Sequence, residues 1–124
     1  MFDGGGDDAR ARQARAAERQ LVLRQEEMAQ QIRLEVQQSW DALATARDSL
    51  ATAAARVEAA RAAFRIASRK RDAGAINQAE FIDARSALTR AELNYTITRF
   101  DVLARRAELE YAVCAGDLPL DPGA

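Results

Sequence analysis

The side chains that most often do chemistry in proteins are scarce in this sequence of 124 residues. It has no histidine and a single cysteine, Cys114, which excludes a disulfide within the chain and the usual zinc sites. Carboxylates are plentiful, but Glu26, Glu27 and Asp48 fall on solvated faces without a histidine, a cysteine or a glycine-rich loop beside them. The sequence therefore predicts no catalytic residue, no metal site, no cofactor and no enzymatic activity.

Charge and hydropathy exclude two further classes of protein. The net charge is −1 and the pI is about 5.5, whereas a nucleic-acid-binding protein normally has a basic face. No apolar run reaches the 18 or more residues that a membrane helix requires, and residues 1–20 lack the apolar stretch of a signal peptide. We therefore expect no nucleic-acid partner and no membrane helix.

Glycine and proline divide the chain into two long segments. No glycine or proline lies between Gly6 and Gly74 or between Gly74 and Gly116, and both prolines come after Gly116. The helical pattern is unbroken over residues 8–72, which corresponds to roughly 95–100 Å of helix. The sequence is also rich in alanine, the best helix former. We expect an all-α protein with two helices, the first much longer than the second.

A seven-residue repeat of large residues runs through both segments. Its members are Val36, Leu43, Leu50, Val57 and Phe64 in the first segment and Phe81, Leu88, Tyr95, Val102 and Leu109 in the second. The residue three positions after each of them is usually small, with Arg105 as the exception. Alternating large and small core positions at this spacing are typical of a coiled-coil seam.

The repeat also predicts where the chain turns. If the helices are antiparallel, large positions face small ones, so that Phe64 pairs with Ala84 and Phe81 with Ala67. The residue numbers of each pair add to 148, which centres the fold on residue 74. Gly74 is also the one candidate for the position after a helix end. The prediction is an antiparallel coiled-coil hairpin with these segments: long helix 8–73, turn 74–76, returning helix 77–115 and flexible tail 116–124.

The residues after the turn fit a helix start. Asn77 can cap the second helix, and Glu80, three residues later, completes a capping box. Ile76 and Phe81 occupy the two positions of a hydrophobic staple. An ordinary hairpin loop explains these residues fully, so the capping pattern alone indicates no function.

Two features predict that other helices cover the hairpin. A second apolar stripe lies on the second helix, opposite the seam, and consists of Leu93, Ile97, Phe100, Ala104, Ala107 and Tyr111. The second helix also reaches back only to about Arg33, so that residues 8–32 of the first helix have no partner. The alternative is a local three-helix arrangement with a bent first helix, although no proline or glycine is present to bend it.

Short motifs along the chain resemble those of a known family, in the right order and spacing. They are Phe2 to Gly5, Glu35 to Trp40 followed by Leu43, Arg71 to Gly74, Phe81 to Arg85, and Leu109-Glu110 followed by Gly116. Over residues 2–116 the chain resembles the second half of the internally repeated outer-membrane efflux proteins of the TolC type. Residues 1–7 would then correspond to the turn that follows the last barrel strand.

The resemblance implies a homotrimer whose strands form an outer-membrane barrel and whose helices form a periplasmic α-barrel. This tube opens when an inner-membrane pump and a periplasmic adaptor protein engage it, and substrates pass through unchanged. We interpret the chain as the helical hairpin of such a channel, used in tripartite efflux or type I secretion. Because it lacks strands and a signal peptide, we expect it to be a soluble fragment that meets the membrane only through the missing barrel.

The resemblance also implies which residues act. The tip that meets the adaptor would consist of Arg71, Asp72, Ala73, Gly74, Ala75, Ile76 and Asn77. Asp83 aligns with an acidic ring that narrows the tube in some members of the family, and Glu80 lies three residues before it. The local alternative remains open, because Glu80 is also the acid of the capping box and Asp83 complements the helix dipole.

Two other functions compete with this interpretation. A periplasmic adaptor also has a long helical hairpin, but its glycine-rich, β-branched lipoyl-like flanks are absent from this sequence. A generic structural coiled coil would explain the heptads, but it leaves the second apolar stripe and the Phe2 to Gly5 motif without a role.

Overall fold

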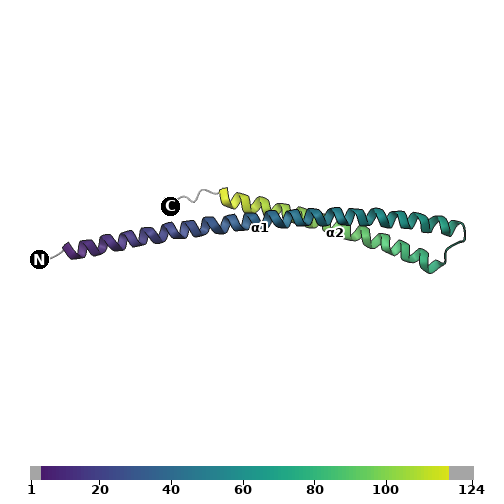
Figure 1. Ribbon diagram of the computed structural model, residues 1–124, viewed down its shortest axis with the longest axis horizontal. Helices are drawn as coiled ribbons and strands as arrows, with labels where there is room; N and C mark the ends of the chain where they lie inside the picture. Colours follow the sequence, from purple (N-terminus) through teal and green to yellow (C-terminus); the bar gives the residue numbers. More distant parts are fainter. Residues whose placement is uncertain (1–3, 118–124) are drawn as a thin grey trace.

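The computed structural model describes residues 4–117, which form two antiparallel helices (Figure 1). Helix α1 spans Gly4–Asp72 and has 69 residues. Helix α2 spans Gln78–Asp117 and has 40 residues, and a short turn joins the two. The prediction of an all-α helical hairpin with a longer first helix is confirmed.

The helix ends differ from the predicted segments. Residues 4–7, predicted as part of a turn, are helical, while residues 1–3 lie outside the described residues. Three glycines disfavour a helix, but the acidic side chain of Asp7 stabilises the positive end of the helix dipole. Helix α2 continues through residues 116 and 117, so the predicted tail begins too early. The rest of that tail, residues 118–124, lies outside the described residues.

The two helices meet along one row of side chains. Its buried members are Leu43, Ala46, Ala53, Val57, Ala67, Phe81 and Ala112. All seven fall on the large or small positions of the heptad repeat, and the remaining positions of that repeat are half-buried. Few of the buried side chains in this seam are large, so most of the surface of both helices remains exposed.

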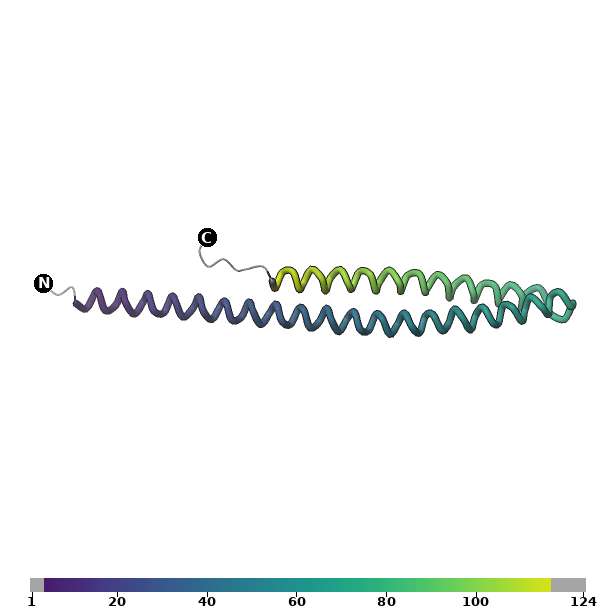
Figure 2. Tube along the Cα trace, turned by 90° about the horizontal axis from the view of Figure 1, so that it is seen from above, coloured from purple at the N-terminus to yellow at the C-terminus, as the bar shows by residue number. Residues whose placement is uncertain are grey.

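The first part of α1 has no helix beside it among the described residues (Figure 2). Every residue from 4 to 31 is exposed, and Ile32 is the first residue of α1 that is partly covered. We call residues 4–31 the overhang. Its large apolar side chains, all exposed, are Leu21, Val22, Leu23 and Met28. An isolated helix of this kind is only marginally stable in water, because helices derive most of their stability from packing.

Candidate interaction surfaces

The turn of the hairpin begins with a glycine-terminated helix end. Gly74 has a φ of 69°, in the left-handed region that glycine tolerates best. The N–H of Ala75 donates to the carbonyl of Lys70 at 2.7 Å, and the N–H of Gly74 donates to that of Arg71 at 3.0 Å. These two bonds form a Schellman motif, which satisfies carbonyls that the helix end leaves free. Gly74 therefore closes α1 with a defined backbone.

The second half of the turn is fixed by a side-chain cap. The Oδ1 of Asn77 accepts a hydrogen bond of 2.8 Å from the backbone N–H of Glu80. This is the bond of an N-cap to the third helical residue. Ile76, just before the cap, is half-buried. The tip is therefore an ordered turn between two well-terminated helices.

Aromatic contacts connect the two helices next to the turn. The rings of Phe64 and Phe81 lie 5.6 Å apart, centroid to centroid, and are tilted by 40°. The guanidinium carbon of Arg71 lies 4.4 Å from the centre of the Phe81 ring, within cation–π distance. This contact holds Arg71, and exposed basic side chains on the same last turns of α1 are Arg65, Arg69 and Lys70. The last turns of α1 therefore present a basic surface beside the turn.

The two acidic residues of the predicted constriction lie on the first turns of α2. Glu80 and Asp83 are both exposed. Among residues 4–117, neither carboxylate forms an ion pair. Their charges are therefore available to a solute or to another chain.

The outer side of α2 carries the apolar stripe that the sequence predicted. All six of its residues are exposed: Leu93, Ile97, Phe100, Ala104, Ala107 and Tyr111. The fractional exposure reaches 66% for Phe100 and 78% for Tyr111. Contiguous exposed apolar side chains of this size are typical of interaction sites. We call these six residues the outer stripe.

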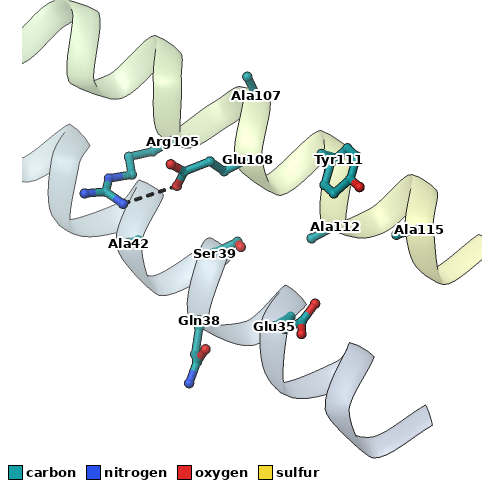
Figure 3. Close-up of a pocket in the computed structure, with 10 residues that line it drawn as sticks. All are labelled: Glu35, Gln38, Ser39, Ala42, Arg105, Ala107, Glu108, Tyr111, Ala112 and Ala115. Carbon is teal, nitrogen blue, oxygen red and sulfur yellow. Dashed lines mark hydrogen bonds and ion pairs between the residues drawn. The ribbon is translucent and has the colours of Figure 1, made fainter. Parts of the chain in front are cut away.

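Two charged features of the seam were not predicted from the sequence. Arg105 occupies a seam position and pairs with Asp101 at 3.5 Å and with Glu108 at 3.2 Å. Figure 3 shows the Arg105–Glu108 pair beside an open groove that Ser39 of α1 also lines. Arg105 was the only charged residue at a small seam position, so the signal was present in the heptads.

The second missed feature is an ion pair between the helices. Arg61 of α1 bonds to Glu92 of α2 at 3.4 Å and to Glu58 of its own helix at 3.1 Å. The side chains of Arg61 and Glu92 are each 49% exposed, so solvent screens the pair. Heptad spacing alone does not predict which of many arginines reaches across the seam.

Comparison with known families identifies the chain. The sequence model of the outer membrane efflux protein family matches residues 1–114. The chain belongs to this family. Comparison with curated proteins and with solved structures found no significant match. The resemblance to TolC-type efflux proteins is therefore confirmed, and the hairpin comes from a family of outer-membrane transport proteins and not of enzymes.

The structure adds two observations to this membership. Neither of the described helices has both the length and the apolar character needed to cross a membrane. Within residues 4–117, no three His, Cys, Asp or Glu side chains come together as a metal site. The tip, the outer stripe and the overhang are the candidate interaction surfaces of this hairpin.

Proposed function

We propose that the chain is the helical-hairpin portion of an outer-membrane channel for tripartite efflux or type I secretion. In this role the hairpin forms part of the wall of a periplasmic tunnel, and its tip docks a periplasmic adaptor protein. The observation that carries the proposal is the exposed outer stripe of α2 in a chain of the outer membrane efflux family.

The wall role follows from the distribution of apolar side chains. Helix α2 is apolar on two sides, and α1 covers only the seam, which leaves the outer stripe free for a second helix. The overhang needs a neighbour as well, because its apolar side chains are exposed over a helix roughly 40 Å long. Helices on both sides of each hairpin are the arrangement of a closed tube. We propose that a homotrimer supplies them.

The docking role is supported by the form of the tip. Arg71, Asp72, Ala73, Gly74, Ala75 and Asn77 are exposed and Ile76 is half-buried. A Cβ on Gly74 would meet no atom within 4 Å, so the backbone at the extreme end of the hairpin is open to close approach. The Schellman motif and the Asn77 cap keep this surface in one conformation, which reduces the ordering cost of binding.

In this role the hairpin has three partners and a periplasmic location. The partners are further copies of the same chain, a periplasmic adaptor protein and an inner-membrane pump that the adaptor connects to the tip. The helices lie in the periplasm, below an outer-membrane portion of the channel. Substrates pass along the tunnel without chemical change.

Phe100→Glu tests the wall role. A carboxylate in the middle of the outer stripe would have to be buried without a partner when a second helix packs there, which is costly. We expect Phe100→Glu to lower self-association of the chain in sedimentation equilibrium, and to lower trimer yield in a channel assembled with this hairpin. Ala87→Glu, at an exposed position about 140° around α2 from Phe100, is the control and should leave both unchanged. Equal association of Phe100→Glu and the parent would refute the wall role.

Gly74→Leu tests docking. A bulky residue at this open backbone position should abolish efflux without loss of the trimer. Because Leu at a φ of 69° also strains the turn, Ala75→Leu serves as a second variant that adds bulk where φ is not positive. Efflux at the parent level in both variants, with the trimer intact, would remove the docking role.

A further inference from the structure

The charges of this nearly neutral chain are not spread evenly over the hairpin, because arginines gather on one face. The ion pair of Arg61 with Glu92, at 3.4 Å, joins the two helices on this face. Residues at multiples of seven from either of these two lie on the same side of the helix pair. Within residues 33–68 and 85–113 they are Arg33, Trp40, Arg47, Ala54 and Ser68 on α1 and Arg85, Arg99, Arg106 and Val113 on α2. We call these residues, together with Arg61 and Glu92, the arginine face.

Most arginines of this face have no ionic partner. All six are exposed to solvent. Arg61 pairs with Glu92 and Glu58, and Arg106 pairs with Glu110, so these three carboxylates are already engaged. The other four arginines of the face form no ion pair among residues 4–117. The face therefore has an excess of positive charge, although the net charge of the whole chain is −1.

Like charges face each other on the arginine face. Arg47 lies two heptads before Arg61, and Arg106 lies two heptads after Glu92, so Arg47 and Arg106 lie at the same level of the hairpin. Positions that flank a coiled-coil seam often hold opposite charges, which pair between the helices as Arg61 and Glu92 do. Two arginines at one level instead repel each other. The stability of the hairpin therefore does not explain the charge of this face, and an anion from outside would.

The arginines are arranged in a straight row. Neighbouring members of a heptad column are about 10.5 Å apart along the helix, and the column from Arg33 to Arg61 is about 42 Å long. The same column continues into the overhang with Arg19 and Arg12, after an interruption at Glu26. Positive charge that repeats along a line matches a linear polymer with repeating negative charge.

The apolar members of the face indicate which kind of polymer it fits. They are Trp40, Ala54 and Val113, and the exposed fraction of Trp40 is 59%. An acidic helix of a partner protein would need a continuous apolar row to pack against, and arginines interrupt the row here. Trp40 and Val113 lie at one level and form a single small apolar platform. A flat indole ring between arginines suits a sugar ring whose neighbours carry negative charge.

From these observations we infer that the arginine face binds a linear glycan that carries carboxylates. The inference rests on the proposed function, which places the helices in the periplasm, where the cell wall is a glycan of this chemistry. Guanidinium groups bind carboxylates through two parallel N–H donors, and the ring of Trp40 stacks on a sugar. A second helix on the outer stripe leaves the face accessible, since Arg99 points about 100° away from Phe100 around α2. Binding would hold the channel in the wall layer.

Co-sedimentation with purified peptidoglycan sacculi tests the inference. Arg47→Gln/Arg99→Gln removes two arginines of the face that form no ion pair among residues 4–117. Arg24→Gln/Arg56→Gln is the matched control, because both side chains are exposed, lie in other heptad columns and likewise form no ion pair in that range. We expect the first variant to bind about fivefold more weakly than the parent and the control to bind nearly as the parent does. Binding by the parent should also weaken as salt is added.

Trp40→Ala separates a glycan from an acidic protein. We expect it to weaken binding to sacculi but not to poly-L-glutamate, a polyanion without sugars, whereas Arg47→Gln/Arg99→Gln should weaken binding to both. Circular dichroism checks that each variant remains helical. Binding to sacculi that Trp40→Ala leaves unchanged would assign the face to acidic proteins and overturn the glycan.

Two other results would overturn the inference as well. One is a parent chain that does not sediment with sacculi, and the other is an equal loss of binding in Arg47→Gln/Arg99→Gln and its control. The assay needs no assembled channel, so either result counts against this inference alone. The wall and docking roles are decided separately by Phe100→Glu and Gly74→Leu.

Discussion

Ile32 of α1 lies directly against Gly116 of α2, so that a Cβ on Gly116 would be 3.0 Å from the Cγ2 of Ile32. The two residues are at the far end of the hairpin from the turn, and their numbers add to 148, as those of the seam pairs do. The register set around Gly74 is therefore kept along the whole of α2. Ile32 is also the first residue of α1 that is partly buried, because every residue from 4 to 31 is exposed.

We predict that residues 32 and 116 are energetically coupled. Gly116→Val should crowd Ile32, and the cost should shrink in the Ile32→Ala background, which gives a coupling energy of about 0.5 kcal/mol or more in a double-mutant cycle. The free energies of unfolding come from urea titrations followed by circular dichroism at several protein concentrations. Gly116→Val combined with Leu34→Ala, an exposed residue nearby, is the control cycle and should show no coupling. Coupling as weak as in the control would contradict the register.

The hairpin was predictable because its signals repeat. Ten heptad positions agree on one antiparallel register, and Gly74 at its centre is the residue with a positive φ among residues 4–117. The outer stripe was predictable for the same reason. The cation–π contact of Arg71 and the ion pair of Arg61 were not predictable from the sequence. A long side chain can reach several neighbours, and its rotamer, which the spacing of residues does not determine, decides which of them it contacts. The start of α1 at Gly4 was not predicted, because three consecutive glycines have a low helix propensity.

Gly74→Ala should lower the stability of the hairpin by about 1 kcal/mol, because alanine is disfavoured at a φ of 69°. Gly5→Ala, in the exposed overhang, is the matched substitution and should raise helix content, since alanine is the better helix former by about 1 kcal/mol. Thermal unfolding followed at 222 nm compares the two. The same sign for both changes would show that the turn does not depend on glycine at this position.

Substitutions of Phe81 and Phe100 are expected to affect different processes. A change at Phe81 should weaken the folding of the hairpin, and a change at Phe100 should weaken its self-association. Phe81 is buried, with 8% exposure, and packs on Phe64, so Phe81→Ala should destabilise the hairpin by roughly 3 kcal/mol. Phe100 is on the outer stripe, so Phe100→Ala should leave the unfolding of the dilute chain within about 0.5 kcal/mol of the parent. Sedimentation at higher concentration should show the reverse order, with weaker association for Phe100→Ala. A large loss of stability in dilute Phe100→Ala would place that ring in the fold of the single hairpin instead.

The last prediction concerns the carboxylates near the tip. Asp83→Asn and Glu80→Gln should each reduce the cation selectivity of a channel assembled with this hairpin, because rings of carboxylates attract cations by Coulomb interaction. The fold should change little, since neither carboxylate forms an ion pair among residues 4–117. The cap at Asn77 should also remain, because Asn77 accepts its hydrogen bond from the backbone N–H of residue 80 and not from the side chain. Reversal potentials in asymmetric salt measure selectivity, with Glu58→Gln on the far side of the seam as the control. Cation selectivity equal to the parent in both variants would exclude the acidic ring and leave these residues with their local roles at the start of α2.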